Sequence, residues 1–158
     1  MKFIHKGYYD HMEESHELLA FYGNEKIWDI LAENPRNRVV VFGEQPEMLR
    51  FPCSTQSYTD IEGSGGNFNL SSSPEALADF FTFAGVDYIY LGSGYLKPGT
   101  DGFRNVTGLL KQGYLMDLLY ENGNGLAVFS SDPKNLTEEE SEALLAEFTE
   151  KYWPGEQQ

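Results

Sequence analysis

The chain has 158 residues, of which 41% are hydrophobic and 15% aromatic, a composition that suits one folded domain and excludes a disordered chain. Eleven basic residues stand against 25 acidic ones, so the net charge at neutral pH is −14. Phosphate backbones and anionic lipid headgroups are bound through lysine and arginine. The charge therefore excludes nucleic acid as a main partner and favours a well-solvated acidic surface.

The first third of the chain predicts helices followed by one buried strand. Residues 8–33 have helical apolar spacing, Asn24 is a favourable N-cap for the second part of that segment, and Pro35 ends it. The β-branched run at 38–43 predicts a strand that is covered on both faces of a sheet. The pattern that follows is weaker, and residues 48–51 predict a short edge strand.

The middle of the chain predicts a crossover from one strand to the next. Ser73 is placed as the N-cap of a helix, and Gly85 has the position of a glycine that ends it. Residues 86–92 then predict a second buried strand, and this order of elements favours a right-handed parallel crossover. Residues 93–105 predict a loop rich in glycine and proline, and residues 106–112 a short helix.

The segment after Gly113 allows two structures. Its apolar residues would fit a continued helix, but Asn122-Gly123 is a strong signal for a two-residue hairpin turn. The hairpin is favoured, with strands at 114–121 and 125–131, because Gly113 would end the preceding helix. The choice matters for the fold, since a hairpin adds two antiparallel strands to the sheet.

The C-terminal segment begins with Thr137 and Glu140 at the spacing of a capping box, which predicts a final helix. Together the patterns predict an α/β fold: a small Rossmann-like three-layer domain with a mostly parallel sheet and an antiparallel C-terminal hairpin. The two buried strands are expected to be parallel neighbours, with the hairpin at one side. The expected organisation is a single domain over 1–158, with a helical lead-in at 1–22, a core at 23–131 and a C-terminal acidic helix at 132–158.

No catalytic or metal-binding motif is evident. Cys53 is the only cysteine, which excludes an internal disulfide and a paired-cysteine metal site. No histidine lies near it in sequence, so a packed, neutral thiol is expected rather than a nucleophile. His5, His11 and His16 lack the spacing of a metalloprotease helix and favour a polar helix face. We therefore predict no catalytic residue, no metal site and no cofactor in this chain.

The candidate ligand-binding surfaces are two strand ends, because α/β sheets bind ligands beyond the carboxyl ends of their strands. The sequence around Ser93 matches neither a nucleophile elbow nor a phosphate-binding loop, so the predicted role is contact with a ligand and not catalysis. A simple turn is the plainer alternative for both glycine-rich ends. The predicted ligand-binding residues are Gly43, Glu44, Gln45, Ser93, Gly94 and Tyr95.

Three acceptor sequons for N-linked glycosylation begin at Asn69, Asn105 and Asn135. They would carry glycans only in a secretory host. As local signals, they predict that these three positions lie in exposed loops.

Three segments between residues 20 and 131 follow one another in a distinctive order. They are a helix with Trp28 that ends at Asn34-Pro35-Arg36, a Ser-Pro-Glu helix from Ser73 to Phe83 followed by Gly85-Val86-Asp87-Tyr88, and Leu118-Leu119-Tyr120-Glu121-Asn122-Gly123 before Leu126-Ala127-Val128-Phe129. This order resembles the C-terminal extracytoplasmic domain of polytopic membrane glycosyltransferases of the GT-C type and of related multi-spanning membrane proteins. The motifs are short and mostly hydrophobic in pattern.

The resemblance implies a Rossmann-like domain on the extracytoplasmic side of a membrane, attached to a membrane-embedded transferase. Its expected partners are the membrane-embedded part of the same polypeptide and a saccharide or lipid-linked sugar. The catalytic acidic residues of that family lie in loops of the membrane part, so none is carried over to this chain. The lack of membrane helices and the acidic helix after Asp132 depart from the family pattern.

The leading hypothesis from the sequence is a non-catalytic accessory domain of a membrane glycosyltransferase-like protein, which positions a donor or an acceptor. The first alternative is an autonomous α/β module that binds a small polar ligand or a partner protein, and a cytoplasmic location is expected for it. The second alternative is a free-standing enzyme acting on nucleotides or sugars, which would need a closed pocket with converging polar groups.

Overall fold

A computed structural model of the chain describes residues 24–43, 51–58, 61 and 72–152. The helices and strands defined within them are, in chain order, α2 (Glu25–Ala32), β1 (Arg38–Phe42), β2 (Ser54–Ser57), α4 (Pro74–Ala84), β3 (Tyr88–Leu91), α5 (Asp101–Lys111), β4 (Leu115–Glu121), β5 (Asn124–Phe129) and α6 (Glu138–Tyr152). The predicted lead-in helix and all three histidines lie outside the described ranges.

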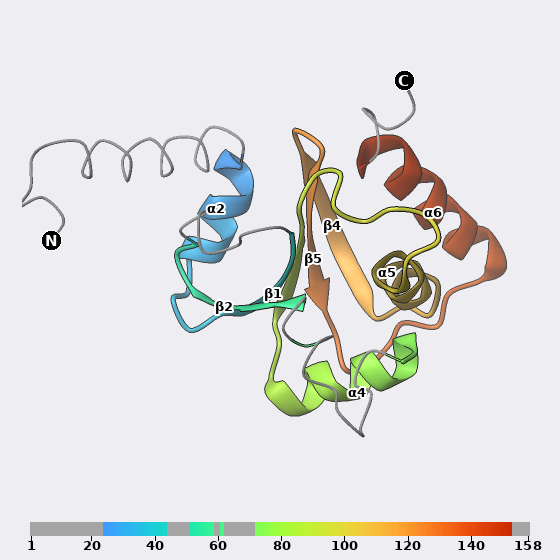
Figure 1. Ribbon diagram of the computed structural model, residues 1–158, viewed down its shortest axis with the longest axis horizontal. Helices are drawn as coiled ribbons and strands as arrows, with labels where there is room; N and C mark the ends of the chain where they lie inside the picture. Colours follow the sequence, from blue (N-terminus) through green and yellow to red (C-terminus); the bar gives the residue numbers. More distant parts are fainter. Residues whose placement is uncertain (1–23, 44–50, 59–60, 62–71, 153–158) are drawn as a thin grey trace, which may run out of the picture.

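The strands form one five-stranded sheet in the order β2-β1-β3-β5-β4 (Figure 1). Strand β1 pairs in parallel with both β2 and β3, while β5 is antiparallel to both of its neighbours. Only β5 therefore runs against the common direction of the other strands. This confirms the predicted α/β fold, including the parallel pair of buried strands and the C-terminal hairpin at one side of them.

Helices cover the sheet on both faces and make three layers (Figure 1). One core lies beneath α4, α5 and α6, from which Phe81, Leu109 and Phe148 are buried against the strands. The second core lies beneath α2, whose Ile27 and Leu31 are fully buried. Strands β1 and β3 are enclosed by both cores, which explains why their sequences are continuous apolar runs and do not alternate.

The two helices with the clearest predicted start signals are capped as expected. The Ser73 hydroxyl accepts a hydrogen bond from the Ala76 N–H at 3.0 Å, and Gly85 ends α4 in the left-handed region at φ 71°. At the start of α6, the Thr137 hydroxyl accepts from the Glu140 N–H at 3.1 Å, and the Glu140 carboxylate accepts from the Thr137 N–H at 2.9 Å. The capping box is thereby confirmed.

Helix α5 begins five residues before the predicted start at residue 106. The Thr100 hydroxyl caps it by accepting from the Phe103 N–H at 3.3 Å. Gly102 made this stretch resemble a loop, but a Cβ there would lie 3.2 Å from Leu96 and 3.3 Å from the ring of Tyr58. The glycine is thus explained by close packing of α5 on its neighbours and does not mark a turn.

The sequon prediction is wrong at Asn105 and correct at Asn135. Asn105 lies inside α5, is 0% exposed, and donates a hydrogen bond to the Tyr58 hydroxyl at 3.1 Å. Asn135 is exposed outside the regular elements. Asn69 lies outside the described residues. Because the Asn105 amide is buried and hydrogen-bonded to Tyr58, it cannot accept a glycan in the folded domain.

The predicted edge strand at 48–51 is not supported where it can be assessed. Residues 48–50 lie outside the described ranges, and Phe51 belongs to no strand. Its ring packs beneath α2, with centroids 4.6 Å from Trp28 and 5.1 Å from Tyr90. The edge strand is instead β2, a polar and largely exposed stretch without the apolar alternation that would have revealed it.

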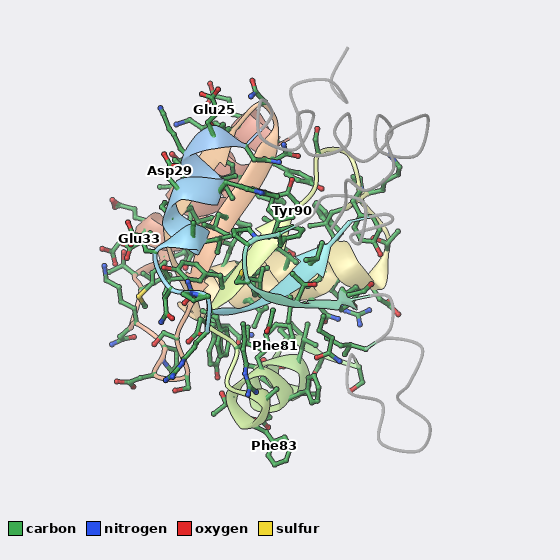
Figure 2. The ribbon with its side chains drawn as sticks, turned by 90° about the vertical axis from the view of Figure 1, so that its left-hand side faces the viewer. Glu25, Asp29, Glu33, Phe81, Phe83 and Tyr90 are labelled. Carbon is green, nitrogen blue, oxygen red and sulfur yellow. The ribbon has the colours of Figure 1, made fainter. Side chains whose placement is uncertain are left out.

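The outer surface of the domain is charged along α2 and carries one isolated aromatic ring on α4. Figure 2 shows Glu25, Asp29 and Glu33 along the outer side of α2, opposite the buried Tyr90. On α4, Phe81 points into the core, whereas Phe83 points away from it and is 89% exposed. A single exposed ring does not form an apolar patch, so Phe83 does not by itself indicate a binding surface.

Candidate functional site

The carboxyl ends of β1 and β3 meet at one edge of the sheet. The Gly92 N–H donates to the Phe42 carbonyl at 2.8 Å, and a Cβ on Gly92 would lie 3.4 Å from the Cα of Gly43. From here the chain leaves β1 toward β2 on one side and leaves β3 toward α5 and β4 on the other. This divergence is the topological switch point at which open α/β sheets commonly bind ligands.

The loop after β3 is held in place by the C-terminal helix. The Tyr95 N–H donates to the Gly92 carbonyl at 3.1 Å, and Gly94 has a positive φ of 75°. The Tyr152 hydroxyl of α6 donates to the Gly92 carbonyl and accepts from the Leu96 N–H at 3.0 Å. The Tyr152 hydroxyl is therefore hydrogen-bonded to both ends of the loop, at Gly92 and at Leu96.

The predicted site residues are only partly placed together by the structure. Gly43 is buried at the end of β1, Ser93 is exposed, and Gly94 and Tyr95 are half-buried. The other two predicted residues, Glu44 and Gln45, lie outside the described ranges. The glycine contact between β1 and β3 brings Gly43 beside the loop of the other three.

Sequence reasoning missed the polar residues that surround this loop. The Asn124 side-chain carbonyl accepts from the Ser93 N–H at 2.8 Å, and its amide nitrogen donates to the Asn24 side-chain oxygen at 2.9 Å. The Tyr90 hydroxyl donates to the same Asn24 oxygen at 3.4 Å. Asn24 is 3% exposed, so this neutral network is mostly withdrawn from water. The predicted hairpin placed Asn124 next to its turn, but no sequence signal indicated that this turn lies beside the ends of β1 and β3.

Asn24 does not cap α2, contrary to the prediction, because its side chain makes no capping bond. The Glu121 carboxylate takes that role from the end of β4. One of its oxygens accepts from the Lys26 N–H at 3.0 Å and the Ile27 N–H at 3.2 Å, and the other accepts from the Lys26 N–H at 3.1 Å. The helix terminus that would attract an anionic ligand is thus filled by the protein's own carboxylate.

Replacement of Glu121 by alanine is expected to destabilise the domain by about 1 kcal/mol, since two helix N–H groups lose their charged acceptor. Chemical denaturation of the two proteins measures the difference. Glu33→Ala is the matched control, because Glu33 stands at the C-terminal end of the same helix, where a carboxylate is unfavourable. A loss of stability in the control as large as that in Glu121→Ala would contradict the capping role.

Burial raises the pKa of the Tyr90 phenol in this polar network and that of Cys53, which precedes β2 at the other end of the strands. Burial raises the pKa of Tyr90 to about 12, opposed in part by its hydrogen bond to Asn24, so the phenol remains a donor at physiological pH. Burial and, to a smaller extent, the Asp87 carboxylate raise the pKa of Cys53 above its ordinary value. A raised pKa favours the neutral thiol that the sequence predicts.

Alkylation of Cys53 by iodoacetamide at about pH 8 is expected to be slower than that of the same cysteine in the urea-unfolded chain. The thiolate is the reactive form, and a raised pKa lowers its fraction at that pH. The rate should continue to increase as the pH passes the ordinary thiol pKa. Mass spectrometry over time measures both rates, and equal rates in the folded and unfolded chains would contradict the prediction.

Two arrangements would indicate catalysis by the described residues, a metal-binding cluster and a serine activated by a base. No three His, Cys, Asp or Glu side chains gather there as they would around a metal ion. The Ser93 backbone N–H is bonded to Asn124, and no base is hydrogen-bonded to its hydroxyl within the described ranges. The described residues therefore show no group that would activate Ser93 as a nucleophile, and the predicted contact role stays a prediction.

Comparison with protein-family models, curated proteins and solved structures gives no match for this chain. In the described ranges no helix is long and apolar enough to cross a membrane.

Proposed function

We propose that the chain is a non-catalytic accessory domain of a membrane glycosyltransferase-like protein, and that the carboxyl edge of its sheet holds the neutral sugar part of a donor or an acceptor. The observation that carries this proposal is the Glu121 carboxylate seated on the start of α2 beside the Asn24–Asn124 network. An edge built in this way accepts neutral hydroxyl groups and disfavours phosphate.

The electrostatics of the edge support a neutral ligand. Both helices that begin there have terminal N–H groups that are already bonded. Glu121 accepts from two of them in α2, and Thr100 accepts from one, that of Phe103, in α5. Glu25 adds negative charge in the first turn of α2, whereas Asp101 in the first turn of α5 is paired with Arg104. A phosphate would meet occupied donors and like charge, whereas sugar hydroxyls can both donate to and accept from amide side chains.

The α/β fold with a C-terminal hairpin agrees with the expectation from the membrane glycosyltransferase resemblance. On this proposal the domain lies on the extracytoplasmic side, and the membrane-embedded part of the same polypeptide supplies the reacting groups.

The alternative is an autonomous module that binds a small polar ligand through the same edge. The two cores on opposite faces of the sheet favour it, because such a domain is stable without a covering partner. Antibodies against the chain distinguish the two proposals. Detection of a larger polypeptide in the native membrane fraction supports the accessory domain, and detection of a soluble polypeptide of this length supports the module.

The ligand proposal is tested by titrating the ¹⁵N-labelled chain with glucose, mannose and N-acetylglucosamine and, separately, with inorganic phosphate and UDP-glucose. Sugars are expected to shift the amide signals of Ser93 to Tyr95 and of Asn124, whereas phosphate leaves them in place. Asn124→Ala should abolish the response, and Asn135→Ala, at an exposed position outside the edge, should retain it. A stronger response to phosphate, or turnover of UDP-glucose by the pure chain, would overturn the proposal.

A further inference from the structure

The two edge strands of the sheet differ in how they are protected against pairing with another strand. Strand β4 is irregular, because its register shifts between Met116 and Leu119 and Asp117 has a positive φ of 51°. Bulges and charges of this kind are the usual means of blocking an edge. Strand β2 has neither: its register with β1 is regular and its sequence is Ser-Thr-Gln-Ser.

Strand β2 is also accessible. Its first three residues, Ser54, Thr55 and Gln56, are exposed, and within the described ranges its only pairing is with β1. A regular and uncharged edge is unusual in a chain with a net charge of −14. Such an edge offers main-chain hydrogen bonds to an added strand, which is the basis of peptide recognition by strand addition.

A cavity of about 270 Å³ lies directly beside this edge, under the C-terminal end of α4. Its walls include polar side chains of β2 and apolar side chains of the neighbouring elements. Among the lining residues are Arg38, Val40, Ser54, Gln56, Ala84 and Val86. Arg38 is opposite Ser54 in the β1–β2 register, and Val40 is opposite Gln56, so these four residues share one face of the sheet.

The Arg38 guanidinium is the charged group of this cavity. One of its nitrogens donates to the Ala84 carbonyl at 2.7 Å, at the C-terminal end of α4. The nearby Asp87 carboxylate accepts from the Arg38 backbone N–H at 3.0 Å, and no ion pair joins it to the guanidinium. A guanidinium has five N–H donors in a fixed fork, and Arg38 lines the cavity, so donors beyond the one bonded to Ala84 remain for an acceptor that enters it.

We propose that β2 binds an extended peptide segment of a partner protein, and that an acidic side chain of this segment enters the cavity and pairs with Arg38. In an added strand, alternate side chains point to the same face of the sheet as Arg38 and Gln56. A Glu on that face can extend over Ser54 toward Arg38 and accept hydrogen bonds from the guanidinium fork. Main-chain hydrogen bonds give the peptide its affinity, and the ion pair with Arg38 gives the preference for an acidic residue. This inference is independent of the proposed sugar site. That site lies at the carboxyl end of β1, whereas Arg38 is the first residue of β1.

The test is a titration of the ¹⁵N-labelled chain with the peptide acetyl-Thr-Val-Glu-Val-Thr-amide and with versions that carry Gln or Lys in place of Glu. The Glu peptide is expected to shift the signals of Arg38 and of Ser54 to Gln56, and to bind about tenfold more tightly than the Gln peptide. The Lys peptide is expected to bind more weakly still.

Three variants assign the preference to the guanidinium. Arg38→Gln should make the Glu and Gln peptides bind equally, and Arg38→Lys, which keeps the charge without the fork, should retain part of the difference. Arg36→Gln is the matched control, since it removes an equal charge from an exposed position outside the cavity, and it should leave the preference intact. Dispersed spectra of each variant confirm that it is folded.

Several results would overturn the proposal. They are equal binding of the Glu and Gln peptides by the unmodified chain, an absence of shifts along β2 with every peptide, and shifts confined to another surface. Concentration-dependent broadening of the β2 signals without peptide would also overturn it, because the occupant of the edge would then be a second copy of the chain.

Discussion

Substitution of Gly113 by alanine is expected to destabilise the domain by at least about 3 kcal/mol. Gly113 follows α5 with φ 85°, a conformation that costs an L-residue roughly 1–2 kcal/mol. A Cβ at this position would also lie 2.0 Å from the Lys134 carbonyl oxygen, which belongs to the backbone and cannot rotate away. The loop before α6 would have to move, and the Lys134 N–H would lose its bond to the Gly113 carbonyl.

Thermal unfolding followed by circular dichroism measures this effect, and a decrease in Tm of roughly 6–12 °C is expected for a domain of this size. Gly99→Ala is the matched control. Its φ of 90° imposes a similar backbone penalty, but no atom lies within 4 Å of the added Cβ. The control should therefore lose only about 1 kcal/mol, and an equal loss in both variants would show that the contact with Lys134 is unimportant.

Removal of the Tyr152 hydroxyl, as phenylalanine, is expected to cost about 1–3 kcal/mol. This hydroxyl donates to the Gly92 carbonyl and accepts from the buried Leu96 N–H. Its loss leaves the Leu96 N–H without its acceptor and leaves the Gly92 carbonyl with the Tyr95 N–H as its donor. The ring itself remains stacked on Phe148, with centroids 5.0 Å apart, so the packing is preserved. Urea denaturation measures the loss, and hydrogen exchange at Leu96 should become faster.

Tyr120→Phe provides the opposite case with the same chemical change. The Tyr120 hydroxyl is buried and has no hydrogen-bond partner within the described ranges, and burial, with a smaller contribution from Glu147, raises the pKa of this phenol. Its removal is expected to be neutral or stabilising, because an unsatisfied buried polar group is lost. A similar loss of stability in Tyr152→Phe and Tyr120→Phe would contradict the bridging role of Tyr152.

The sequence was most informative where local chemistry determines the structure. The valine run of β1 and the aromatic run of β3 are enclosed by helices on both faces, and continuous apolar sequence is the signature of that environment. The hairpin was predictable from Asn122 and Gly123, whose positive φ values of 53° and 81° are the ones that a two-residue turn of this kind requires. These signals act within a few residues of the structure that they specify.

The features that were missed depend on contacts between distant segments. Asparagine commonly caps helices, but the side-chain oxygen of Asn24 accepts hydrogen bonds from Asn124 and Tyr90 instead. No local sequence pattern links either residue to Asn24. Gly102 was interpreted as a loop residue, whereas a glycine is needed there because α5 packs closely against Tyr58. Of the candidate site, the strand ends were predictable from the order of elements, whereas the polar network around them required the tertiary structure.

The long sequence separation of the α2 cap has a consequence for the order of folding. Helix α2 has only 8 residues, too few to be stable alone in water, and its terminal N–H groups are bonded to a carboxylate 95 residues further along the chain. During synthesis, this helix therefore leaves the ribosome well before its cap does. We expect α2 to consolidate late, after the hairpin has formed, so that substitutions in it mainly accelerate unfolding and leave the rate of folding nearly unchanged.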